Sequence, residues 1–163
     1  MKLQSLVTKS FIYYLREQME DNDYVNGNYD VIDAYPADYD KVNIFPTISV
    51  ERVNTTKIPY QIGSRDRKKL IYSIDVFAYG QNQKDDVVEI LMDNLQHKYI
   101  NIYNFNSGFP SAVGVYGAIP KLGEGYVESF NAHSIPPPSF TNVAQKKYHE
   151  MINIVVVLPI IDV

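Results

Sequence analysis

The sequence predicts an α+β domain in which a largely antiparallel sheet carries two main helices on one face. Three observations support this class. Only two segments repeat apolar side chains with a helical period. The expected strands follow one another in pairs, which favours antiparallel pairing over alternating βα units. The length of 163 residues suits a single domain, so we expect residues 1–163 to fold as one unit.

Residues 3–20 predict the first helix. Its apolar positions recur at helical spacing: Leu3, Leu6, Val7, Phe11, Tyr14 and Leu15. The helix is expected to end in the acidic, turn-prone segment at residues 20–23. Residues 21–43 are rich in Asp, Asn and Tyr without a sustained period, and we expect them to wrap the surface with a short strand near residues 29–32.

The centre of the chain predicts two strands followed directly by a second helix. Residues 45–53 alternate apolar and polar side chains, as do residues 70–79. A helical stripe begins near Asn82, immediately after the second strand. We expect this strand and this helix to pack together through five apolar side chains: Tyr72, Ile74, Val87, Leu91 and Leu95.

The C-terminal part combines strands with a long irregular region. Residues 99–105 predict a third strand. Residues 107–125 hold five of the eight glycines, so residues 107–145 are predicted to form a Gly/Pro-rich loop or hairpin insertion. Residues 108–138 of it are expected to project from the domain and to contact neighbouring subunits. Within it, residues 125–135 could return as a strand, and three successive prolines at 136–138 exclude a central strand there. Residues 150–161 are apolar on both faces, which predicts a strand covered on both sides.

Composition excludes several classes of protein. The chain has no cysteine, which rules out disulfides, thiolate zinc sites and a cysteine nucleophile, and suits a reducing compartment. The N-terminus lacks a secretory signal, and no run approaches the ~18 apolar residues of a membrane span, so we expect a soluble protein without membrane contact. A net charge of −4 argues against general nucleic-acid binding.

No motif in the sequence predicts catalysis. The three histidines, His97, His133 and His149, lack metal-ligand spacing, and the glycines do not form a phosphate-binding loop. We therefore predict no enzyme activity, no cofactor and no metal ligand. Two alternatives stay open: a small intracellular enzyme with a pocket near His133, and a host-cell binding module that recruits a partner through some of the fourteen tyrosines.

Six residues are candidate contacts with other subunits or partners. The only basic cluster spans residues 65–69 and is either a solvated hairpin loop or a contact with an acidic neighbour. Aromatic side chains in the predicted insertion are large, rigid and amphipathic, which suits surfaces buried only in a complex. The candidates are Arg65, Arg67, Lys68, Phe109, Tyr116 and Tyr126.

Residues 45–95 also carry a recognisable pattern. A strand with the sequence Ile74-Asp75-Val76-Phe77-Ala78 leads through a short turn into a helix that contains Gln83-Lys84-Asp85-Asp86-Val87, and Ile62-Gly63 precedes both. This pattern resembles the central segment of tail terminator (tail completion) proteins of tailed bacteriophages and of related head–tail connection proteins. The resemblance covers roughly residues 1–105.

The resemblance implies a structural protein of the virion. Such proteins form a ring, commonly a hexamer, that caps the tail tube and docks it to the connector of the head. The implied partners are further copies of the chain, the tail tube protein and neck connector proteins. Phage DNA would pass through the lumen without specific binding, and assembly would occur in the host cytoplasm. Another neck or head–tail connector protein is the alternative within the same class.

Overall fold

The computed structural model describes residues 2–33, 42–58, 67–110, 119–136, 148–159 and 161. These residues form two helices, six strands and one short 3-10 turn. In chain order they are α1 (Leu3–Asp21), β1 (Asp30–Asp33), β2 (Thr47–Ile58), β3 (Arg67–Ala78), α2 (Gln81–Leu95), β4 (Tyr99–Tyr103), the 3-10 turn (Phe105–Ser107), β5 (Lys121–Ile135) and β6 (Tyr148–Leu158).

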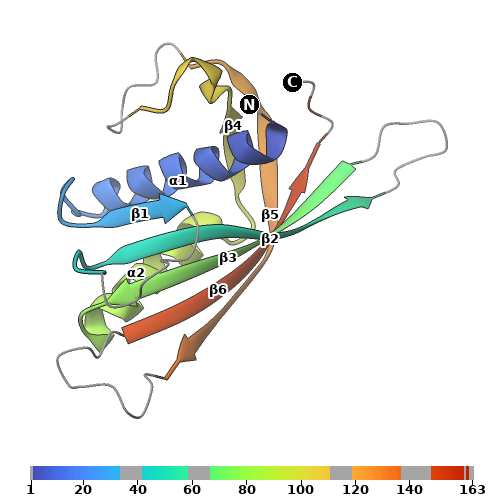
Figure 1. Ribbon diagram of the computed structural model, residues 1–163. Coiled ribbons are helices and arrows are strands. Elements are labelled where there is room, and N and C mark those ends of the chain that lie inside the picture. Colours follow the sequence, from blue (N-terminus) through green and yellow to red (C-terminus); the bar gives the residue numbers. More distant parts are fainter. Residues whose placement is uncertain are drawn as a thin grey trace.

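The six strands make one mixed sheet in the order β1-β2-β3-β6-β5-β4 (Figure 1). Only β1 and β2 run parallel, while each of the other neighbouring pairs is antiparallel. The predicted α+β class with two helices and a largely antiparallel sheet is confirmed.

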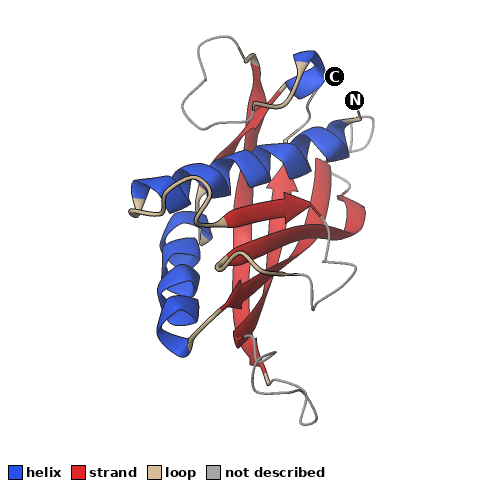
Figure 2. Ribbon diagram, turned by 60° about the vertical axis from the view of Figure 1, so that its left-hand side comes forward, coloured by secondary structure: helices blue, strands red, loops and turns tan. Residues whose placement is uncertain are grey.

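Both helices pack on the same face of the sheet, where they cross one another (Figure 2). The predicted contact between β3 and α2 is confirmed, because its five side chains are fully buried in one cluster: Tyr72, Ile74, Val87, Leu91 and Leu95. The side-chain periods of β3 and α2 account for this packing. Alternate residues of β3 face the helices, and every third or fourth residue of α2 faces the sheet.

Helix α1 also covers the two edges of the sheet. The Arg16 guanidinium donates to the Val31 carbonyl of β1 at 3.2 Å, and the Tyr103 N–H of β4 donates to the Ser10 hydroxyl at 2.9 Å. Edge strands with free backbone groups invite pairing with other chains. One side chain of α1 therefore hydrogen-bonds a backbone group at each edge of the sheet. The faces of the molecule are then more available than its edges for association with other chains.

The predicted insertion at residues 107–145 is not confirmed. Residues 121–135 form the long strand β5, which pairs with β4 on one side and with β6 on the other. The glycines that suggested a flexible loop include Gly123 and Gly125 inside this strand. A Cβ on Gly125 would lie 3.0 Å from Val156 and 3.1 Å from Leu158, so the glycine permits close packing. Residues 111–118 and 137–147 of the predicted insertion lie outside the described residues.

The substitution Gly125→Ala should lower the free energy of unfolding by about 1–3 kcal/mol, because the new methyl group overpacks a rigid core. Urea denaturation followed by circular dichroism measures the change. Gly123→Ala is the matched comparison, since its Cβ would meet the side chain of Ile161 at 3.3 Å, a looser approach, so its loss should be smaller. Equal losses in the two variants would contradict this role of Gly125.

Candidate interaction surface

The sheet face opposite the helices is incompletely covered. Alternation along β3 and β6 places Ile71, Met151, Val155 and Val157 on this face, and all four are half-buried. The prediction that β6 is covered on both sides is confirmed for the helix-facing side, while the described side chains of β6 on the other side are half-buried. Its apolar run reflects one face in the core and a second face that both described helices leave uncovered.

A hollow of about 340 Å³ opens on this face where β3, β6, β5 and β4 adjoin. We call it the tyrosine hollow. Two of the predicted contact residues, Arg67 and Tyr126, come together in it although 59 positions separate them in the sequence. The lining residues are Arg67, Tyr99, Glu124, Tyr126, Glu128, Val157, Leu158 and Pro159.

Aromatic rings form one wall of the tyrosine hollow. The ring centroids of Tyr99 and Tyr126 lie 5.0 Å apart, and the His97 ring stacks on Tyr126 at 6.5 Å. Tyr99 remains 66% exposed. A rigid, wet aromatic surface of this kind is typical of protein interfaces, where Tyr is enriched. Sequence reasoning did not select Tyr99. Its alternation with Ile100 in β4 was the available signal that it points away from the core.

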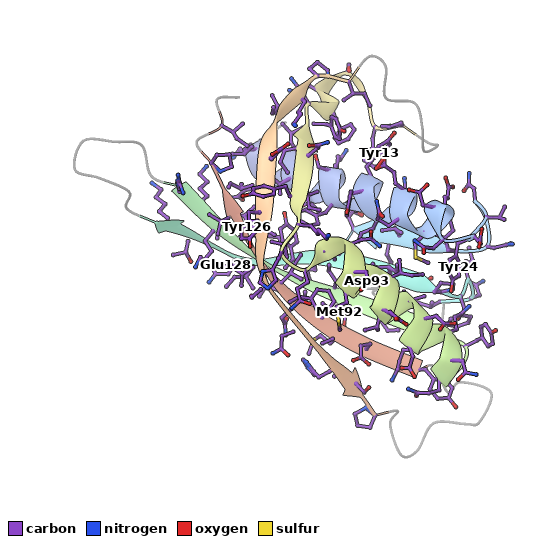
Figure 3. All side chains as sticks on the ribbon, turned by 180° about the vertical axis from the view of Figure 1, so that it is seen from behind. Tyr13, Tyr24, Met92, Asp93, Tyr126 and Glu128 are labelled. Atoms are coloured by element: carbon purple, nitrogen blue, oxygen red, sulfur yellow. The ribbon has the colours of Figure 1, made fainter. Side chains whose placement is uncertain are left out.

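The charges around the tyrosine hollow are partly paired within the chain. Lys69 bridges Glu128 at 2.9 Å, and Lys121 bridges Glu124 at 2.7 Å. Glu128 follows Tyr126 along β5 (Figure 3). Exposed pairs of this kind add less than about 1 kcal/mol to stability. Because of these two pairs, each carboxylate that lines the hollow already has a lysine beside it.

The other predicted contact residues do not join this surface. Lys68 alternates with Arg67 and Lys69 along β3 and so points to the opposite face. Phe109 is half-buried beneath α1, against Tyr13 at 6.3 Å, with the cations of Lys9 and Arg16 above its ring. Arg65 and Tyr116 lie outside the described residues.

A second groove, of about 530 Å³, lies between the end of α1 and α2. It is lined by Asn22, Asp23, Tyr24, Asp86, Glu89, Ile90, Asp93 and Asn94, so four carboxylates and no cation face it. Burial, followed by the charge of Asp86, raises the pKa of Tyr24 above its usual value. Tyr24 and Asp93 are both visible in Figure 3. The outer side of α2 is therefore strongly acidic.

One buried cluster contains a serine and a lysine, as some catalytic sites do, but its polar groups bind one another. Lys84 of α2 donates to the Ser134 hydroxyl at 2.9 Å and lies 3.3 Å from Glu150, and Ser134 donates to Glu150 at 2.7 Å. A serine–lysine pair needs a neutral amine to activate the hydroxyl. Here the ammonium has a carboxylate partner, and the hydroxyl proton is directed at the same carboxylate.

A second polar pair lies on the helix-free face. His149 of β6 contacts Asp75 of β3 at 2.7 Å and stacks on Phe77 with centroids 4.5 Å apart. Neither His149 nor His133 lines the tyrosine hollow, the acidic groove or the hollow of about 270 Å³ beside β1. The pocket near His133 that the enzyme alternative requires is thus not among these three.

Within the described ranges, no group of three or more His, Cys, Asp or Glu side chains is placed to hold a metal ion. No described helix combines the length and the apolar character needed to cross a membrane. No protein family model matches the sequence, and no curated protein matches it.

Proposed function

We propose that this protein is a structural subunit of a phage virion that assembles into a ring of the tail terminator type. The ring would cap the tail tube and join it to the connector of the head. The observation that carries the proposal is the helix-free face, where apolar side chains, the exposed Tyr99 and the half-buried Tyr126 line the tyrosine hollow. A soluble chain gains most from such a surface when another protein covers it.

The arrangement of the central segment supports the same proposal. Ile74–Ala78 lie in β3, a two-residue turn follows, and Gln83–Val87 lie in the first half of α2. Helix α1 precedes this unit, in the order that the resemblance implies. These residues are structural and carry no chemistry, as expected of an assembly protein.

Ring formation sets a requirement that the fold can meet. Successive subunits of a ring touch through two different patches, because a patch that binds itself produces only a two-fold dimer. The helix-covered side carries the acidic groove beside α2, and the helix-free face carries the tyrosine hollow, so the two sides offer unlike patches. The tail tube protein and neck connector proteins are the further partners, and the net charge of −4 suits a lumen that does not retain DNA.

The expected result in solution is a closed ring, most simply a hexamer, seen by native mass spectrometry and by negative-stain electron microscopy. Tyr99→Ser should raise the dissociation constant of self-association about tenfold or more, because interface tyrosines often contribute more than about 1 kcal/mol. Tyr79→Ser is the control, since Tyr79 is 70% exposed but does not line the hollow. A wild-type protein that stays monomeric at every accessible concentration contradicts the proposal.

The role in the tail is tested separately. Purified rings are mixed with phage tail tubes that lack a terminator, and binding is scored by electron microscopy. Rings at one end of the tube support the tail terminator role. Rings that bind the head connector and never the tube support another position in the neck.

A further inference from the structure

The turn that joins α1 to β1 contains the dipeptide Asn26-Gly27, the only Asn-Gly pair in the sequence. The N–H of Asn28 donates to the Val25 carbonyl at 2.8 Å, so Asn26 and Gly27 hold the two central positions of a β-turn. Gly27 has a φ of +96°, whereas Asn26 keeps a negative φ, which is the pattern of a type II turn. All four residues of the turn are exposed.

Turn geometry requires the glycine but not the asparagine. A φ of +96° is accessible to Gly27 because it carries no Cβ. The position before it in a type II turn favours proline and does not call for asparagine. Within the described part of the chain, neither the Asn26 side chain nor the Gly27 N–H has a hydrogen-bond partner. The side-chain amide of Asn26 is therefore free to react with the neighbouring backbone.

We propose that Asn26 is a site of spontaneous deamidation, where the side-chain amide becomes the carboxylate of aspartate or isoaspartate. The reaction takes place within a single chain, so it does not depend on the proposed assembly. It needs water and no enzyme, cofactor or second protein.

The deamidation proceeds through a cyclic imide. Loss of its proton to hydroxide makes the Gly27 backbone nitrogen a nucleophile, which attacks Cγ of Asn26. The new N–Cγ bond closes a succinimide ring, and the Cγ–Nδ2 bond breaks as Nδ2 takes a proton from water and leaves as ammonia. Water then opens the ring. Attack of water at Cγ gives aspartate, whereas attack at the main-chain carbonyl carbon gives isoaspartate, in which Cβ has become part of the backbone.

The surroundings of the turn favour this attack. A Cβ at position 27 would meet nothing within 4 Å, so hydroxide and water reach the Gly27 nitrogen without obstruction. Glycine itself leaves the nitrogen unshielded, because it lacks the side chain that hinders approach in other residues. Asn131 offers a contrast, since it lies opposite Asn153 in the ladder of β5 and β6, which restricts rotation of the backbone. Asn26 should therefore be converted before Asn131.

Conversion at Asn26 changes the surface and leaves the core intact. Before the turn, the Tyr24 N–H donates to the Met19 carbonyl at 3.0 Å. After it, the Tyr29 hydroxyl donates to the Glu20 carboxylate at 3.0 Å, so bonds to α1 hold both flanks of the turn. The product carries one more negative charge two positions from Tyr24, which lines the acidic groove. A chain that has aged in solution is therefore more acidic beside this groove than a new one.

Peptide mass mapping of the purified full chain tests the proposal. The chain is incubated at mildly alkaline pH in water labelled with a heavy oxygen isotope. The peptide that contains Asn26 should exchange an NH for a labelled oxygen about tenfold or more faster than the peptide that contains Asn131, because glycine leaves the attacking nitrogen unshielded. An isoaspartate methyltransferase should detect isoaspartate in the same peptide. The rate should rise with pH, since hydroxide removes the Gly27 proton.

Three variants identify the reacting atoms. Gly27→Ala should slow the conversion about tenfold, because its methyl group shields the nitrogen. Alanine is also strained at this φ, so Asn26→Gln provides a second variant that keeps the glycine. It should abolish the conversion, since the longer side chain closes a ring much less readily. Asn28→Gln is the matched control and should react at the wild-type rate, and circular dichroism checks that every variant is folded.

The rates decide the outcome independently of the assembly. Equal rates at Asn26 and Asn131, or an unchanged rate in Gly27→Ala, overturn the proposed deamidation site. A wild-type protein that stays monomeric contradicts the proposed function and leaves the deamidation site standing.

Discussion

Leu91→Ala is expected to lower the free energy of unfolding by about 2–5 kcal/mol, as other substitutions of alanine for a fully buried leucine do. Leu91 is completely buried on the inner side of α2, in the cluster that joins this helix to the sheet. Removal of three carbon atoms there leaves a cavity between rigid elements. Urea denaturation at equilibrium measures the change.

Met92→Ala provides the matched control one residue along the same helix. Because Met92 points outward, we expect its truncation to change the free energy of unfolding by no more than about 0.5 kcal/mol. A loss below about 0.5 kcal/mol for Leu91→Ala would show that the helical stripe is not part of the core.

The local periods of the sequence predicted most of the elements. Residues 3–20 and the segment starting near Asn82 gave helices within one residue of α1 (Leu3–Asp21) and the start of α2 (Gln81–Leu95). The strands β2, β3, β4 and β6 were also expected, with ends that differ by a few residues. These elements have one clearly apolar side, and a single buried side is what periodicity detects.

Strand β5 could be predicted only in part, because its first residues break local rules. Gly123 and Gly125 are signals for a loop when they are considered alone. Their role depends on Val156 and Leu158, which reach Gly125 from β6, about 30 positions away. A close approach between distant segments leaves no period in the local sequence.

The candidate surface was predictable only as separate residues. Arg67 was selected for its charge and Tyr126 for its ring, and the strand order β3-β6-β5 brings both to one hollow. That order includes a long-range pairing of β3 with β6, which local patterns do not specify.

Lys84→Ala is expected to lower the free energy of unfolding by about 3–5 kcal/mol, the range for removal of one partner from a buried ion pair. The side chains of Lys84 and Glu150 are 5% and 10% exposed, and their charged atoms lie 3.3 Å apart. Without the ammonium, Glu150 retains only the Ser134 hydroxyl as a partner among the bonds described above, which does not balance a desolvated charge.

Two controls distinguish the buried charge from a general effect of losing a lysine. Lys121→Ala breaks the exposed pair with Glu124 and should change the free energy of unfolding by less than about 1 kcal/mol. The double variant Lys84→Met with Glu150→Gln removes both charges and should recover most of the stability that Lys84→Ala loses, because no unpaired buried charge remains. If the double variant is as unstable as Lys84→Ala, the loss comes from packing around the lysine stem at the start of α2, and the ion pair is not its cause.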